Sequence, residues 1–228
     1  MELLPQIHLL SSLGFVNAYL LVGDKLALVD TGMAGQSGKV LGYVARLGRQ
    51  PQDLAQIFLT HYHLDHAGSL AALKAATGAA VYASPADAAV ISGQTPQPLP
   101  RDWRRWVVWL EDRLMPVRPC PVDRLLSDGD SLPIPGLGEL RAVASPGHTP
   151  GHLCYYLPQR RLLFTGDALI NTGKLAGANP QFSLDMAQAR AAVHKLATLY
   201  VDVLCFSHGP PIVAGLGHVQ AELRVSPS

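Results

Sequence analysis

The sequence predicts an α/β protein in which two β-sheets pack together with helices on their outer faces. Short apolar strands alternate with turn residues, and a succession of strands followed by helices occurs twice along the chain. The composition agrees, because 48% hydrophobic and 15% charged residues describe a folded chain with a large core. At 228 residues, this chain can form one domain or two halves that share a core.

The first half of the chain begins with strands and continues with strands that alternate with helices. Amphipathic helices are predicted at residues 38–47 and 70–76, each ending at a glycine, Gly48 and Gly78. Ser84, followed by Pro85 and by Asp87, marks the start of a further helix. The apolar runs predict strands at residues 7–10, 15–22, 26–30, 57–59 and 80–82.

The second half repeats this pattern and predicts the second sheet with its covering helix. Ser183 is expected to cap a long helix in which Met186, Ala189, Val193 and Leu196 share one face. The strands are expected at residues 132–134, 140–144, 154–157, 161–165 and 201–206.

Residues 93–121 differ in character from the rest of the chain. A proline-rich connection at 93–100 leads into a helical segment that holds all three tryptophans, with Trp103, Trp106, Leu110 and Leu114 on one face. Two interpretations stay open: the stripe packs on the domain, or the segment is an insertion that forms a lid or a dimer surface beside the substrate pocket. The adjacent pair Arg104 and Arg105 either meets an anionic substrate or is solvated.

Charge, cysteines and the N-terminus restrict the classes of partner and the compartment. A formal charge of +1 weighs against a nucleic-acid partner. Cys120, Cys154 and Cys205 are an odd number without a C-x-x-C spacing, which indicates neither a disulfide framework nor a cysteine metal site. Residues 1–5 contain no basic leader, and polar residues interrupt the apolar stretch that follows. We therefore expect a cytoplasmic protein without a membrane partner.

Residues 60–68 hold three imidazoles and one carboxylate within six positions, directly after the apolar run 57–59. Such a density of His61, His63, Asp65 and His66 is typical of a metal site and suits zinc, with iron or manganese as alternatives. In extended backbone the side chains at 61, 63 and 65 point to one side, while His66 turns outward as a helix begins. This spacing can serve two neighbouring metals.

Five polar side chains follow the ends of apolar strands, although they are far apart in sequence. If these strand ends lie along one edge of the fold, the five groups converge on one rim site. For the first of them, Asp30, a turn-capping role and a role behind a metal ligand are both open. The five residues are Asp30, His61, His148, Asp167 and His208.

The stretch His61–His66 resembles the H-x-H-x-D-H mark of the metallo-β-lactamase-fold superfamily, and residues 145–152, 164–167 and 207–209 resemble its later motifs. The resemblance implies an αββα sandwich, a single domain over 1–228 with the tryptophan-rich insertion at about 93–121, and two Zn²⁺ ions. It implies that His152 is structural, and His8, His194 and His218 match no motif. The implied ligands are His61, His63 and His148 for one metal and Asp65, His66 and His208 for the other, with Asp167 bridging.

The implied function is that of a dinuclear metal-dependent hydrolase that cleaves a small ester, thioester or lactone with a metal-bridging hydroxide. The catalytic residue Asp65 would orient this nucleophile or relay its proton to the leaving group. No serine or cysteine nucleophile is needed, so Ser145, Ser207 and Cys205 are read as structural. We expect a small-molecule substrate. If the tryptophan segment forms a dimer surface, we expect a homodimer through residues 101–118.

Several branches of the superfamily remain as alternatives. The chain resembles glyoxalase II, but only 20 residues follow His208, so the glutathione-binding helical domain of that branch is not expected. Ile170 stands where quorum-quenching lactonases commonly have tyrosine, and the expected lack of an export signal weighs against a β-lactamase. A persulfide dioxygenase with one iron shares the F-T-G-D-A-L stretch at 164–169, and a transfer-RNA-type nuclease is disfavoured by the near-neutral charge.

Overall fold

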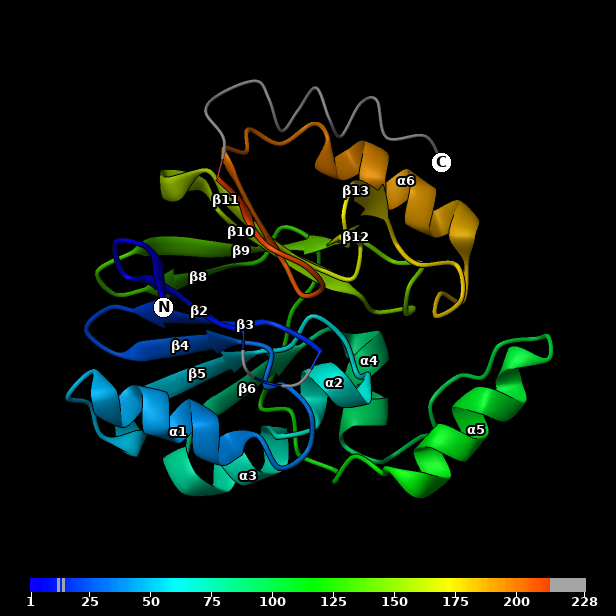
Figure 1. Ribbon diagram of the computed structural model, residues 1–228, viewed down its shortest axis with the longest axis horizontal. Helices are drawn as coiled ribbons and strands as arrows, with labels where there is room; N and C mark the ends of the chain where they lie inside the picture. The colour runs from blue at the N-terminus through cyan, green and yellow to red at the C-terminus, as the bar shows by residue number, and fades with distance from the viewer. Residues whose placement is uncertain (12, 14, 214–228) are drawn as a thin grey trace. The chain divides into compact units, whose positions relative to one another are not determined.

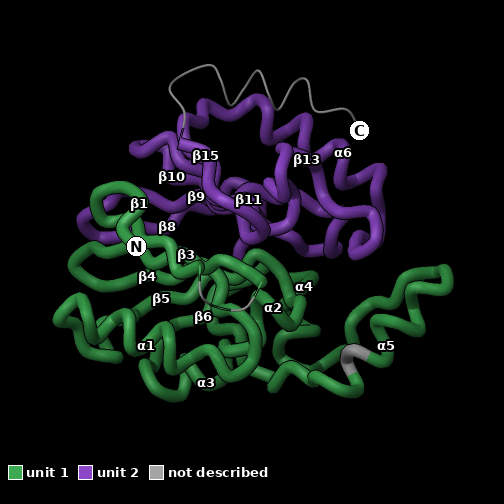
Figure 2. Tube along the Cα trace, in the orientation of Figure 1, with its two compact units in different colours: residues 1–125 green, residues 126–228 purple. Residues whose placement is uncertain are grey.

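The computed structural model describes residues 1–11, 13 and 15–213, and describes residues 111 and 112 without their side chains. The chain divides into two compact units, Met1–Leu125 and Leu126–Ser228 (Figure 2). The expected single domain with an insertion at about 93–121 stays a prediction.

Unit 1 is built on a seven-stranded sheet whose strands lie side by side in sequence order. Strands β1 to β4 pair antiparallel, and β4 to β7 pair parallel. The C-terminal ends of β4 and β5 therefore lie at the same edge of the sheet. The strands are β1 (Glu2–Leu4), β2 (Ile7–Leu10), β3 (Ala18–Val22), β4 (Leu26–Val29), β5 (Leu54–Phe58), β6 (Ala80–Ala83) and β7 (Arg124–Leu125).

Helices connect the parallel strands of unit 1, and α1 and α3 lie on the same side of its sheet (Figure 1). Val40 and Val44 of α1 and Leu73 of α3 are fully buried in one apolar core with strand residues such as Ile57. The elements are α1 (Ser37–Arg46), a 3₁₀ turn at Pro51–Asp53, α2 (Leu64–Ala67), α3 (Leu70–Thr77), α4 (Pro85–Ile91) and α5 (Arg104–Leu114).

Unit 2 contains a six-stranded sheet in the order β15-β14-β11-β10-β9-β8 and the separate hairpin β12-β13. Strands β9 and β11 both run antiparallel to β10, and β14 runs parallel to β11. The C-terminal ends of β9, β11 and β14 therefore share one edge. The elements are β8 (Ser131–Ile134), β9 (Gly138–Ala144), β10 (Leu153–Leu157), a 3₁₀ turn at Pro158–Arg160, β11 (Leu162–Gly166), β12 (Leu169–Asn171), β13 (Leu175–Gly177), α6 (Met186–Leu196), β14 (Val203–Phe206) and β15 (Ile212–Val213).

The predicted fold class, α/β with two mixed sheets and flanking helices, is confirmed. The predicted helix end at Gly78 and helix start at Ser84 are also confirmed. Helix α3 ends at Gly78 with φ +71°, and the Ser84 hydroxyl accepts the Asp87 amide N–H at the start of α4. None of the helices in the described ranges combines the length and the apolar character that a membrane span requires.

Three local predictions are wrong. Asp185, and not Ser183, caps α6, because its carboxylate accepts the amide N–H groups of Ala187 and Gln188. The strand expected from residue 15 begins at Ala18. Asp65 lies in helix α2, so positions 61, 63 and 65 do not alternate along one extended strand.

The tryptophan stripe is exposed, so the interpretation that it packs on the domain is wrong. Helix α5 stands away from the sheet of unit 1 (Figure 1), and the side chains of Trp103, Trp106 and Leu114 are 71%, 61% and 69% exposed. Val108, on the opposite side of the helix, is only partly exposed.

Candidate metal centre

The imidazoles of His61 and His63 meet at the C-terminal edge of the unit 1 sheet, in the loop between β5 and α2. Nε2 of His61 lies 3.0 Å from Nδ1 of His63. The other ring nitrogen of His61, Nδ1, lies 3.0 Å from the hydroxyl of Thr60. Because this hydroxyl donates its hydrogen to the Asp30 carboxylate, it accepts from Nδ1 of His61. His61 therefore presents Nε2 as its ligand atom.

His66 is oriented by Asp30, which directly follows β4. Nδ1 of His66 lies 2.9 Å from Oδ2 of Asp30, and the amide and hydroxyl of Thr60 also donate to this carboxylate. A carboxylate can only accept, so Nδ1 of His66 carries the proton and Nε2 carries the ligand lone pair. Asp30 therefore has both of the roles that the sequence left open. It caps the turn after β5 by accepting from Thr60, and it orients the imidazole of His66.

Asp65 is a partly exposed member of the unit 1 group. It lies in the first turn of α2, its side chain is 25% exposed, and its Oδ2 is 3.6 Å from Nε2 of His66. His63 precedes this helix, and its carbonyl accepts the amide N–H groups of His66 and Ala67. The helical turn thereby places a carboxylate and an imidazole side by side.

In unit 2, one carboxylate oxygen of Asp167 approaches two imidazoles. Oδ2 lies 3.4 Å from Nε2 of His148 and 3.3 Å from Nε2 of His208. Asp167 directly follows β11, and the other two residues follow β9 and β14 at the same sheet edge. Ser183 donates to the carbonyl of Asn179, so its hydroxyl accepts from Nδ1 of His148 at 3.3 Å.

Two glycines let the loops of unit 2 approach closely enough to hold these histidines. Gly147 has φ +130°, and a Cβ there would lie 2.2 Å from the amide nitrogen of Ala189 in α6. Gly209 has φ +100°, and a Cβ would lie 1.8 Å from the carbonyl oxygen of Asn171, whose own amide donates to the carbonyl of His208. The residues beside His148 and His208 must therefore be glycine.

The donor set of each unit fits a metal ion. Two nitrogen or oxygen atoms that are each about 2.1 Å from one ion lie roughly 3.0 to 3.4 Å apart at bond angles of about 90° to 109°. The His61–His63, His148–Asp167 and His208–Asp167 distances, 3.0, 3.4 and 3.3 Å, have these values. Both Asp167 distances exceed the roughly 2.7–3.2 Å of an ordinary N–H···O hydrogen bond. Imidazole and carboxylate donors suit Zn²⁺, iron or manganese.

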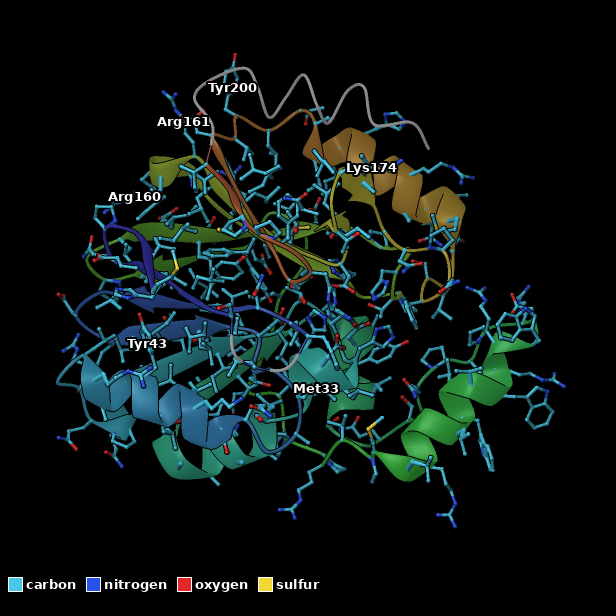
Figure 3. The ribbon with its side chains drawn as sticks, viewed as in Figure 1. Met33, Tyr43, Arg160, Arg161, Lys174 and Tyr200 are labelled. Atoms are coloured by element: carbon cyan, nitrogen blue, oxygen red, sulfur yellow. The ribbon has the colours of Figure 1, made fainter. Side chains whose placement is uncertain are left out.

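The other predicted residues have structural surroundings. Nε2 of His152 accepts the Asp167 amide N–H, and Nδ1 of His8 lies 3.0 Å from the hydroxyl of Tyr43, labelled on α1 in Figure 3. Burial raises the pKa of the Cys205 thiol well above its usual value, which opposes a role as nucleophile. His194 is exposed, and His218 lies outside the described residues.

Sequence reasoning missed two residues that orient the histidines, Thr60 and Ser183. Thr60 carried a usable signal, because it stands directly before the first histidine at the end of β5. Ser183 carried none, because it is 35 positions from His148.

Comparisons with known proteins agree with this fold and with a metal-binding site. The sequence matches the metallo-beta-lactamase superfamily over residues 12–208. It is 29% identical to a probable metallo-hydrolase, YflN, of Bacillus subtilis over 81% of this chain and 75% of that protein. It is 32% identical to a hydroxyacylglutathione hydrolase of Fuscovulum blasticum, again over 81% of this chain, but spans only 57% of that relative.

Two solved structures resemble the whole described fold. The metallo-beta-lactamase family protein TTHA1429 of Thermus thermophilus superposes with a TM-score of 0.75 at 26% identity, over 98% of this chain and 78% of that one. TTHA1623, solved in a di-iron-bound form, superposes with a TM-score of 0.69 at 28% identity, over 97% of this chain and 98% of that one.

Proposed function

The chain belongs to the metallo-beta-lactamase superfamily, and we propose that it is a dinuclear metal-dependent hydrolase that cleaves a small ester, thioester or lactone. The observation that carries this proposal is the approach of one Asp167 oxygen to both His148 and His208. A carboxylate oxygen placed between two imidazoles suits an aspartate that serves two metal sites.

We assign seven ligands, four from unit 1 and three from unit 2. The first metal takes His61, His63 and His148, the second takes Asp65, His66 and His208, and Asp167 serves both. Within each unit the distances support this grouping, and convergence of the two groups on one metal pair is part of the proposal. Zinc is the expected metal, and the di-iron form of TTHA1623 supports iron as an alternative.

The residues behind the ligands keep the imidazoles in one tautomer. Thr60, Asp30 and Ser183 each engage Nδ1 of a different histidine, which leaves Nε2 as the ligand atom of His61, His66 and His148. When bound, a divalent metal pair supplies a water of lowered pKa and a Lewis acid for the carbonyl oxygen.

Asp65 is the proposed catalytic residue. Its carboxylate is partly exposed, unlike the fully buried imidazole of His66, and so it can reach the attacking water. As the water oxygen attacks the acyl carbon, one carboxylate oxygen of Asp65 would accept a proton from that water. Asp65 would then give this proton to the leaving alcohol or thiol.

The net charge and the relatives support a small-molecule substrate. The formal charge of +1 supports a small molecule over a nucleic acid. The hydroxyacylglutathione hydrolase of Fuscovulum blasticum supports a thioester, although the chain spans 57% of that enzyme. The absence of a nucleic-acid or membrane partner and the cytoplasmic location stay predictions.

The test combines metal quantification with a substrate panel of thioesters, lactones, β-lactams and phosphodiesters. We expect two metal ions per chain and turnover of a thioester, an ester or a lactone. Asp167→Ala should lose a metal and turnover while remaining folded by circular dichroism. One iron per chain with oxygen uptake on a persulfide would contradict the proposal and favour the persulfide dioxygenase alternative. Full activity in Asp167→Ala would contradict the bridging role.

A further inference from the structure

His152 lies between the main chain of Asp167 and the side chain of Ser145, and all three residues are buried in unit 2. The Asp167 amide N–H donates to Nε2 of His152 over 3.0 Å. On the other side of the ring, Nδ1 lies 2.8 Å from the Ser145 hydroxyl. The histidine thus connects β9, which Ser145 follows, to the turn after β11.

The direction of these hydrogen bonds fixes the proton on the ring. An amide N–H can only donate, so Nε2 accepts and its lone pair is engaged; the proton is on Nδ1, which donates to Ser145. The Ser145 hydroxyl lies 3.2 Å from Sγ of Cys154, and this thiol donates to the carbonyl of Thr165 at 3.2 Å. The engaged Nε2 lone pair explains why this histidine is not a ligand.

The series of hydrogen bonds begins and ends on the segment that presents Asp167. It starts at the amide of Asp167 and finishes at the carbonyl of Thr165, on either side of Gly166. Gly166 ends β11 with φ +50°, and in the turn that follows, the Ala168 amide N–H donates to the Thr165 carbonyl over 3.1 Å. Hydrogen bonds on both sides of this glycine restrict the rotation that would swing the Asp167 carboxylate away from His148 and His208.

We propose that His152 is a positioning residue, which holds the Thr165–Asp167 turn so that one Asp167 oxygen serves both metal sites. The proposal deepens the proposed function and rests on it. It differs from the simpler assignment of His152 as a buried core residue. A core residue contributes only to stability, whereas a positioning residue also sets the metal affinity of the folded protein.

The test compares two substitutions that both remove the imidazole from the full-length chain. His152→Gln keeps an acceptor, Oε1, for the Asp167 amide, and His152→Leu fills the space without one. Zinc affinity is measured by chelator competition, and amide hydrogen exchange at Asp167 is measured by NMR on the metal-free protein. His8→Leu is the matched control, because it also removes a buried, hydrogen-bonded histidine, but from unit 1.

We expect His152→Leu to bind zinc about 10 to 100 times more weakly than the wild type and to exchange the Asp167 amide faster. His152→Gln should recover most of the zinc affinity and of the amide protection, and His8→Leu should keep the wild-type affinity. Wild-type affinity in His152→Leu, or equal losses in the Leu and Gln variants, would overturn the positioning role.

A separate outcome tests the function on which this inference rests. If the wild type binds no zinc, iron or manganese, the proposed hydrolase is wrong. The hydrogen bonds of His152 can still be measured in the metal-free protein. The ¹⁵N chemical shifts of the ring show whether Nδ1 carries the proton, and the hydrogen exchange rate of the Asp167 amide shows whether that amide is bonded. A ring protonated at Nε2 would contradict the positioning role independently of any metal.

Discussion

Nδ1 of His66 lies 2.9 Å from Oδ2 of Asp30, and both side chains are almost completely buried, at 0% and 1% exposure. A carboxylate in such a position requires donors, and it receives them from His66 and from the amide and hydroxyl of Thr60. The pair therefore couples the turn after β5 to the orientation of a proposed metal ligand.

Asp30→Asn should weaken metal binding without distorting the backbone. Asp30 has φ +60°, a conformation that asparagine also tolerates, so the substitution mainly replaces the carboxylate by an amide. Asparagine offers one acceptor oxygen to the donors of Thr60 and His66, which meet both oxygens of Asp30. The weaker support of His66 is expected to lower zinc affinity about 10 to 100-fold, which chelator competition measures. Asp53→Asn, on the surface of the same unit, should leave the affinity unchanged. Wild-type affinity in Asp30→Asn would show that Asp30 only caps the turn.

Gly209→Ala should destabilise the protein more than Gly173→Ala. The two glycines have similar φ angles, +100° and +109°, but a Cβ at Gly209 would collide with the Asn171 carbonyl, whereas Gly173 faces open space. We expect about 1–2 kcal/mol of backbone strain at Gly173 and at least about 2 kcal/mol more at Gly209. Urea unfolding measures both losses, and equal losses would argue against the close approach that holds His208.

The Lys74–Asp123 pair predicts an acid-sensitive contribution to stability. Burial works to raise the pKa of Asp123, but hydrogen bonds from Lys74 and from the Val81 amide outweigh it and lower that pKa. A carboxyl with a lowered folded pKa stabilises the fold above its unfolded pKa of about 3.9 and loses this contribution as pH falls through the folded value.

Asp123→Asn should therefore lower the unfolding free energy of the metal-free protein by roughly 0.5–1 kcal/mol at pH 6, a value reduced for solvent screening. The difference from wild type should shrink below about pH 4. Urea unfolding of the wild type, Asp123→Asn, Lys74→Met and the double variant gives the coupling between the two side chains. A difference that grows on acidification would contradict the assignment.

The exposed face of α5 predicts self-association. Three tryptophans of this region and Leu110 and Leu114 are about half or more exposed, and tryptophan is enriched at protein interfaces. A second copy can cover this apolar face with the same face of its own α5, as twofold symmetry requires. We therefore propose the homodimer through residues 101–118.

Light scattering after size exclusion should give a dimer for the wild type and a monomer for Trp106→Asp combined with Leu110→Asp. Tyr200→Asp is the control, because Tyr200 is also an exposed aromatic residue but lies in unit 2 (Figure 3). A wild type that is monomeric at every concentration would contradict the homodimer and would favour the interpretation of this segment as a lid.

Sequence reasoning found the ligand candidates because they follow apolar strands and cluster in short motifs. Asp30 and Asp167 come directly after β4 and β11, and parallel neighbours bring their strand ends to one edge within each sheet. The helix ends at Gly78 and Ser84 were also predictable, because one residue type satisfies the backbone there.

The remaining features depend on contacts between distant residues. Ser183 looked like a helix cap, but its hydroxyl is engaged by His148 and Asn179, and Asp185 caps α6 instead. His152 is hydrogen-bonded to Ser145 and Asp167, and Ser145 is hydrogen-bonded to Cys154; no local sequence pattern indicates these contacts. The sequence left the exposure of Trp106 undecided, because an apolar stripe indicates that a face is to be covered, not what covers it.

The metal content of ligand variants taken one from each unit tests whether the two units share a metal pair. Wild type should hold two ions per chain. His63→Ala, His148→Ala and their double variant should each lose the same single ion, and Asp65→Ala with His208→Ala should lose the other, as read by elemental analysis after dialysis against a chelator. If the double variant His63→Ala/His148→Ala loses both ions where each single variant loses one, the two units do not share a metal pair. If the wild type holds no ion, the proposed dinuclear centre is wrong.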